Sequence, residues 1–327
     1  MFASAIQNSQ PEPRIDSMIA SLREEFELNV EGSVENFLGL NIVHHDDGRI
    51  EFLQTGLIDR VLTELGLMDC SPVAYPAERK PLSSGGNVRM KSWNYASVVG
   101  MLLYISGHSR PDIAFAVHQV ARFTQNPTDK HEKAIILIGR YLKGTRDRGL
   151  VYDPSKQRNR LNAHVDADFA GLYNSEDHED SISVKSRTGY VISFDGCPVL
   201  WKSKLQSLIA LSTLEAEYIA LSQCMRDLIP LRRVLNDIAE AFDLDINVPT
   251  TYSKVFEDNQ GALTLAKAPA MTPRTKHIAL RYHHFREEVR AGHIVIEHIS
   301  SAKQIADIFT KGLRNNFVSL RKELMGW

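Results

Sequence analysis

Four acidic residues in the second half of the chain stand at the ends of predicted strands or in the first turns of predicted helices. They are Asp166, Glu217, Asp258 and Asp307. Each one alone is better explained as a turn former or helix cap. Together, several carboxylates that meet without basic partners repel one another, and a bound divalent cation is the usual remedy. Oxygen-only ligands favour Mg²⁺ or Mn²⁺ over Zn²⁺.

The elements that must position these residues begin near residue 159 and follow the order β-β-β-α-β-α-β-α. The predicted strands are LNAHV, TGYVISF, VLWKS, TYSKVFE and HIVIEHI, and the predicted helices run from Leu214 to about Ile238 (with Pro230 as a kink), from Gln260, from about Thr275 to Arg290 and from Gln304. A hairpin meander followed by crossovers predicts a mixed sheet covered by helices. The first and fourth strands can be neighbours, which would bring Asp166 and Asp258 together.

The first half of the chain has a different pattern. Helical periodicity at 17–26 precedes a hairpin formed by FLGLNIV and RIEFLQ, and a second helix is predicted over 57–65. A stretch rich in Pro, Ser and Gly at 71–94 predicts a long loop, and three helical segments follow it within 95–142. No cluster of catalytic residues is found there, so we expect removal of 1–94 to weaken substrate binding without abolishing chemistry.

Composition limits the protein class. With 327 residues, 43% of them hydrophobic and 24% charged, the chain is long enough for two packed domains and is not a disordered or collagen-like protein. The net charge of −2 provides no global basic field for nucleic acid. Two local basic groups, Lys202 with Lys204 and Arg274 with Lys276, could contact phosphates, but a solvated face is an equally good explanation.

Three widely spaced cysteines, Cys70, Cys197 and Cys224, indicate reduced thiols in an intracellular protein rather than a disulfide framework or a zinc site. No apolar run approaches the roughly 18 residues that span a membrane. The first residues also lack the pattern of a secretory signal. We therefore expect a cytoplasmic protein without a membrane partner.

Several motifs carry a resemblance to a known family. VDADFAG, SRTGYVI, WKSKLQ, EAEYIALS, EDNQGA, TPRTKHI and QIADIFTKGL resemble the ribonuclease H domain of copia-type LTR retrotransposon Pol polyproteins. FLGLNI, YASVVGMLLYISGHSRPDIAFAV and RYLKGTRDRGLVY resemble the end of the reverse transcriptase that precedes it there. The aromatic-x-Asp-Asp motif of the polymerase site is missing, so no polymerase activity is expected.

The resemblance implies an α/β, ribonuclease H-like domain over 159–327, with a mixed five-stranded sheet and flanking helices. Residues 1–158 would be a mainly helical thumb- or connection-like remnant of the reverse transcriptase. The family's metal-binding set is Asp, Glu, Asp, Asp. By motif, Asp166 in VDAD, Asp258 in EDNQ and Asp307 in QIAD match its aspartates.

The matching glutamate is Glu215 or Glu217, and helix geometry separates the two. At about 100° per residue, the apolar stripe of the long helix centres near Leu214, and Glu217 lies roughly 50° from that centre. Glu215 lies roughly 110° away. We therefore predict that Glu217 faces the sheet and is the ligand. Asp168 shares a strand face with Asp166 and is either a second contact or a solvated strand end.

The resemblance implies that the chain would be an endonuclease that cleaves the RNA strand of an RNA–DNA hybrid. Two Mg²⁺ ions, with Mn²⁺ as a substitute, would be held by the four carboxylates. Its partners would be the hybrid and the rest of the Pol polyprotein, and the family implies virus-like particles as the location. The alternative is a decayed, inactive Pol fragment that at most binds nucleic acid. The four intact carboxylate positions favour the enzyme.

Overall fold

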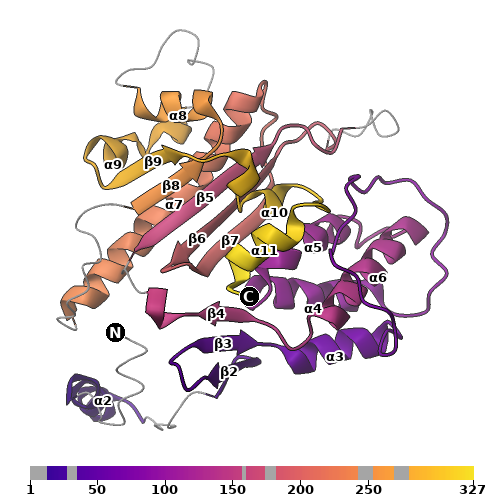
Figure 1. Ribbon diagram of the computed structural model, residues 1–327, viewed down its shortest axis with the longest axis horizontal. Helices are drawn as coiled ribbons and strands as arrows, with labels where there is room; N and C mark the ends of the chain where they lie inside the picture. The colour runs from indigo at the N-terminus through magenta and orange to yellow at the C-terminus, as the bar shows by residue number, and fades with distance from the viewer. Residues whose placement is uncertain (1–12, 28–34, 157–159, 174–181, 242–252, 269–279) are drawn as a thin grey trace.

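The computed structural model describes residues 13–27, 35–156, 160–173, 182–241, 253–268 and 280–327. They form a five-stranded sheet with helices on both faces, beside a helical block that carries a smaller sheet (Figure 1). None of the helices in these ranges combines the length and apolar character that crossing a membrane requires.

The larger sheet is built from the second half of the chain in the order β7-β6-β5-β8-β9. Its strands are β5 (Leu161–Asp168), β6 (Arg187–Phe194), β7 (Cys197–Leu205), β8 (Ser253–Glu257) and β9 (Ile294–His298). β5, β6 and β7 are antiparallel neighbours, whereas β8 runs parallel to β5 and β9 parallel to β8. The predicted ribonuclease H-like mixed sheet, with its first and fourth strands adjacent, is thereby confirmed.

The hairpin between β6 and β7 turns at Asp195 and Gly196. Both residues have positive φ angles, 50° and 83°, as a two-residue turn of this hand requires. Asp195 also accepts a hydrogen bond from the Arg160 amide at 2.9 Å, which fixes the turn against the start of β5. The Asp-Gly pair predicted this hairpin correctly.

The two faces of the sheet are covered by different parts of the chain. Alternate residues of β6 point to opposite faces, so Tyr190 and Ile192 pack with helix α7 (Thr213–Ala241), which contains Pro230. α8 (Gln260–Lys267) and α9 (Arg286–Arg290) lie beyond it near β8 and β9 (Figure 1). Val191, which lies between Tyr190 and Ile192 in the sequence, points to the opposite face of the sheet and joins a core that is shared with the first half of the chain.

The predicted continuous helix from Gln304 is wrong. The chain instead forms a 3-10 turn (Ser301–Lys303), the short helix α10 (Asp307–Thr310) and, after a break, α11 (Phe317–Met325). Gly312 lies in the break, where a Cβ atom would be 2.0 Å from the carbonyl oxygen of Glu78. Close passage of the chain over a distant loop therefore interrupts the helix, a contact that no local pattern reveals.

Of the helix predicted over 275–290, the structure describes a 3-10 turn (Leu280–His283) and α9.

The first half of the chain combines helices with a four-stranded antiparallel sheet. Its elements are α2 (Pro13–Glu25), β1 (Asn36–Phe37), β2 (Leu40–His44), β3 (Ile50–Leu53), α3 (Thr55–Glu64), α4 (Tyr95–His108), a 3-10 turn (Pro111–Ile113), α5 (Ala114–Ala121), α6 (Asp129–Gly144), β4 (Leu150–Tyr152) and a 3-10 turn (Pro154–Lys156). β4 pairs with β3 and so extends the predicted hairpin from a distance of about a hundred residues in sequence.

One apolar core joins the two halves. Buried side chains of α3, α4, α5 and α6 pack with those of α10 and α11. Polar contacts reinforce the junction: the Trp201 indole on β7 donates to the Ser106 carbonyl at 2.8 Å, and the Trp327 indole donates to the Gly149 carbonyl at 2.7 Å. The sheet and the helical block therefore support each other.

Candidate active site

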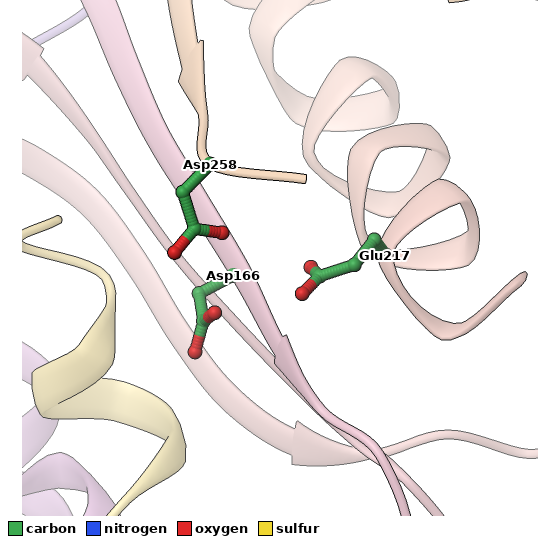
Figure 2. Close-up of side chains that lie close together, drawn as sticks. All are labelled: Asp166, Glu217 and Asp258. Atoms are coloured by element: carbon green, nitrogen blue, oxygen red, sulfur yellow. The ribbon is translucent and has the colours of Figure 1, made fainter. Parts of the chain in front are cut away.

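Three carboxylates converge where β5, β8 and α7 meet. Asp166 lies near the end of β5, Asp258 follows β8 directly, and Glu217 lies in the first turns of α7. One ligand oxygen from each residue lies within 4.8 Å of the others. Figure 2 shows the three side chains close together, with Glu217 reaching from α7 toward the two aspartates. Since β5 and β8 are parallel neighbours, both aspartates emerge at the same edge of the sheet.

Glu215, the alternative to Glu217, has a structural role. Its Oε2 accepts a hydrogen bond from the Leu211 amide at 2.8 Å, and its own amide donates to Ser212 Oγ at 3.1 Å. These contacts satisfy amides at the start of α7, as a capping glutamate does. The structure therefore places Glu217, and not Glu215, in the carboxylate group.

The fourth predicted residue, Asp307, opens α10 and approaches Asp166 from the other side. It is outside the compact group of three, but the ammonium group of Lys311 links it to Asp166. Lys311 Nζ lies 2.9 Å from Asp307 Oδ1 and 3.4 Å from Asp166 Oδ2. The Thr310 hydroxyl also donates to Asp166. The short helix α10 thus brings an acid, a hydroxyl and an ammonium group to Asp166.

Gly189 allows α10 to approach the sheet so closely. It lies opposite Asp166 on β6, and a Cβ atom at this position would be 2.6 Å from Thr310 Cγ2 and 2.8 Å from Phe309 Cβ. Any larger residue would have to push α10 outward. The glycine of the TGY motif therefore sets the distance between Asp166 and Asp307.

Burial and mutual repulsion raise the pKa values of these carboxyl groups. The pKa of Glu217 rises far above its usual range through burial and then through the charges of Glu257, Asp166 and Asp258. The pKa of Asp307 rises to about 7, mainly through burial and then through the charge of Asp166, while Lys311 opposes the shift. Without a divalent cation, this site therefore retains protons at pH values where ordinary carboxyl groups have lost them.

The donor set fits a hard divalent cation. Every candidate ligand atom is a carboxylate oxygen, which Mg²⁺ and Mn²⁺ prefer. Glu217 Oε2 is buried and has no hydrogen-bond partner in the part of the chain that the structure describes. An unsatisfied buried oxygen beside two other carboxylates is what a bound cation would satisfy. Asp258 is held in place by the Ser301 hydroxyl, which donates to its Oδ2 at 2.6 Å.

Two groups at the site were not anticipated from the sequence. Glu257 ends β8 fully buried, accepts a hydrogen bond from the Asn259 amide at 3.0 Å, and has its pKa raised well above normal, chiefly by burial. The inward alternation of Ser253, Val255 and Glu257 could have revealed it. Lys311 follows Asp307 by four residues, which is the spacing of a helical ion pair. This spacing could have revealed Lys311 from the sequence.

The remaining predicted residues lie apart from the three carboxylates. Asp168 is partly buried, and burial raises its pKa to about 6 while Lys311 opposes the shift. Lys202 and Lys204 are exposed on β7, and Lys202 forms an ion pair with Asp227 at 2.7 Å. Arg274 and Lys276 lie outside the described residues.

No model of a known protein family matches the chain. The chain is 34% identical over 321 residues to the retrovirus-related Pol polyprotein from transposon TNT 1-94 of Nicotiana tabacum, covering 95% of this chain and 23% of that protein. It is 30% identical to the corresponding polyprotein from transposon RE2 of Arabidopsis thaliana, covering 90% of this chain and 19% of that protein. A putative transposon Ty5-1 protein of Saccharomyces cerevisiae is 30% identical, over 67% of this chain and 69% of that protein.

The chain therefore spans only about a fifth of the length of the two plant polyproteins. Among solved structures, ribonuclease H1 of the archaeon Halobacterium salinarum is 18% identical, covers 46% of this chain and 94% of its own, and superimposes with a TM-score of 0.29. The N-terminal ribonuclease H domain of a Mycobacterium tuberculosis protein is 12% identical. It covers 49% of this chain and 94% of its own, with a TM-score of 0.31.

Proposed function

Since this chain belongs to the Pol polyproteins of copia-type retrotransposons, we propose that it is a metal-dependent endonuclease that cleaves the RNA strand of an RNA–DNA hybrid. The observation that carries the proposal is the convergence of Asp166, Glu217 and Asp258 within 4.8 Å. These residues come from two strand ends and a helix that lie far apart in the sequence. A purely structural role would not require them to meet.

Asp166, Glu217, Asp258 and Asp307 would hold two Mg²⁺ ions, or Mn²⁺ in their place. When bound, such ions lower the pKa of the attacking water and neutralise the charge that develops on the leaving 3′ oxygen. The products would be a 5′-phosphate and a 3′-hydroxyl.

The protein's own groups prepare this site. Thr310 donates to Asp166 and Ser301 donates to Asp258, so both aspartates are oriented before any ligand arrives. Lys311 balances part of the negative charge near Asp166. Discrimination between RNA and DNA would come from contacts to 2′-hydroxyl groups across the minor groove of the hybrid.

The test is cleavage of a hybrid whose RNA strand carries a 5′ label, with Mg²⁺ or Mn²⁺ present. Asp258→Asn removes one negative ligand while its amide oxygen can still accept from Ser301, so the fold should persist and cleavage should fall about 100-fold or more. Glu323→Gln, an exposed change on α11, is the matched control and should leave cleavage unchanged. A wild-type protein that binds the hybrid but cleaves nothing with either metal would instead support the inactive binding module.

A further inference from the structure

A second group of charged side chains gathers where α5 of the first half meets β6 and β7 of the second. We call His118, Arg122, Arg187 and Lys204 the junction cluster. His118 lies on α5 and Arg122 follows it, whereas Arg187 begins β6 and Lys204 lies near the end of β7. The Arg187 guanidinium lies 5.3 Å from the ring centre of Phe115 on α5, so the two halves meet at this residue.

The cluster is mutually repulsive. Burial, together with the charges of Arg187 and Lys204, lowers the pKa of His118 to about 4. Burial also lowers the pKa of Arg187 to about 10, and Arg122 acts in the same direction while Asp168 opposes it. Like charges that face one another across a junction favour a bound anion between or above them.

Arg187 also has unused hydrogen-bonding capacity. Only 3% of the residue is exposed, and its Nη1 donates to Ser203 Oγ at 3.1 Å. Its Nη2 is buried without a hydrogen-bond partner among the residues that the structure describes. A buried guanidinium nitrogen without a partner is costly, and a phosphate oxygen is a well-matched acceptor for it.

The cluster extends from this buried group to the surface. Arg122 is partly exposed, donates to Gln119 Oε1 at 3.1 Å and lies over the Phe123 ring, and Lys204 is exposed. Lys202, two residues earlier on the same strand, differs because Asp227 pairs with it. Of the two lysines singled out in the sequence, Lys204 therefore belongs to the cluster and Lys202 does not.

The cluster lies next to the carboxylates. Arg187 is paired in register with Asp168, which follows Asp166 by two residues along β5, a step of about 7 Å. A nucleic-acid strand with one phosphate at Asp166 would therefore place neighbouring backbone phosphates near the junction.

We propose that the junction cluster binds the phosphodiester backbone of the nucleic-acid substrate, so that both halves of the chain hold it beside the carboxylates. The identity of the substrate as an RNA–DNA hybrid rests on the proposed function. The binding chemistry itself rests on Arg187 and Arg122, whose guanidinium groups act on each other at the α5 face of the sheet, and on Lys204 at the end of edge strand β7, whose charge acts on His118.

The experiment measures binding of a fluorescently labelled RNA–DNA hybrid to the full chain in EDTA, by anisotropy, across a series of KCl concentrations. Arg122→Gln and Lys204→Gln should each weaken binding several-fold and reduce the slope of log K against log salt by about one. Lys202→Gln is the matched control, since it removes the same charge from the same strand where Asp227 already neutralises it. Its slope should equal that of the wild type, and thermal unfolding verifies that each variant is folded.

The inference is overturned if both cluster variants keep the slope of Lys202→Gln. Its failure is distinguishable from failure of the proposed function, because cleavage by the wild type is measured separately. Wild-type cleavage with unchanged slopes would remove only the junction site. Reduced slopes without wild-type cleavage would leave the junction site standing and reject the nuclease.

Discussion

The ammonium nitrogen of Lys311 lies 3.4 Å from Asp166 Oδ2, inside the group of acids that we propose as metal ligands. Burial alone would lower the pKa of Lys311, but the charges of Asp166 and Asp307 outweigh burial and raise it above its ordinary value. Lys311 is therefore charged, and it supplies in the metal-free protein part of the positive charge that a divalent cation would supply.

Replacing Lys311 by Met should strengthen metal binding, because the cation that competes for the carboxylates is removed. Two unit charges about 4 Å apart interact by roughly 1 to 4 kcal/mol between water and a protein surface, so we expect a gain of about tenfold in Mn²⁺ affinity. Titration calorimetry measures this gain. Lys303→Met, a change at an exposed lysine on the preceding 3-10 turn, should leave the affinity unchanged. Equal affinities in wild type and Lys311→Met would show that Lys311 does not compete.

The stability of the metal-free protein should fall as the pH rises from about 4 to 7. Asp307 has its ordinary pKa of 3.8 when unfolded and about 7 when folded, so between these values the folded state binds more protons than the unfolded state. The free energy of unfolding then decreases with pH, by at most about 1.4 kcal/mol per pH unit for one group. Urea unfolding in EDTA at several pH values measures this slope.

Asp307→Asn should flatten that slope, because the variant has no proton to lose. Saturating Mg²⁺ should stabilise the wild type more at pH 7 than at pH 5, since the metal binds the ionised carboxylates. If the free energy of unfolding of Asp307→Asn has the same dependence on pH as that of the wild type, a group other than Asp307 binds the extra proton in the folded state.

Glu217→Gln and Glu215→Gln should behave differently although the two glutamates are two residues apart. Glu217→Gln removes a ligand and should reduce metal-dependent cleavage about 100-fold or more. Glu215→Gln retains an oxygen that can accept from the Leu211 amide, so both cleavage and stability should stay close to those of the wild type. Cleavage rates together with thermal unfolding of both variants test this contrast, which a reversed result would refute.

Gly189→Ala should destabilise the protein and impair cleavage together. The added methyl group would meet Thr310 and Phe309 at under 3 Å, and overpacking of this kind costs about 1–3 kcal/mol. Displacement of α10 would also move Thr310 away from Asp166. Gly107→Ala on α4 has nothing within 4 Å of its Cβ and is the control, with unchanged or slightly higher stability. Denaturant unfolding and cleavage assays report both effects.

The shared core leads us to predict that residues 159–327 do not fold stably alone, and that removal of 1–94 abolishes activity instead of only weakening binding. In 159–327, Trp201 loses the Ser106 carbonyl and the apolar face of α11 is exposed to water. Removal of 1–94 takes the buried side chains of α3 and Trp93 out of the same core. Removal of 1–34 serves as the control, because the described side chains of α2 lie outside this core. Circular dichroism and thermal unfolding of the three truncated chains would decide, and a cooperative transition for 159–327 would contradict the prediction.

The sequence alone determined the features that depend on local pattern and chain order. Strand alternation and the Asp195–Gly196 turn predicted the meander, and the order of strands and helices allowed β5 and β8 to be neighbours, as they are in the structure. Parallel neighbours end at one edge, so Asp166 and Asp258, which were assigned by motif, could be expected to converge. The apolar stripe of α7 distinguished Glu217 from Glu215, since helix periodicity fixes which side chains face the sheet.

The tertiary structure decided what depends on contacts between distant segments. The last helix is divided at Gly312 because the backbone of Glu78 passes against it, and Arg187 reaches the junction because α5 packs on the sheet. Trp201 joins the core through Ser106, nearly a hundred residues earlier. Such contacts leave no periodic signal in the sequence. Whether two distant segments touch depends on how the shapes of both fit together, and the residues between them do not show how far apart the segments lie in space.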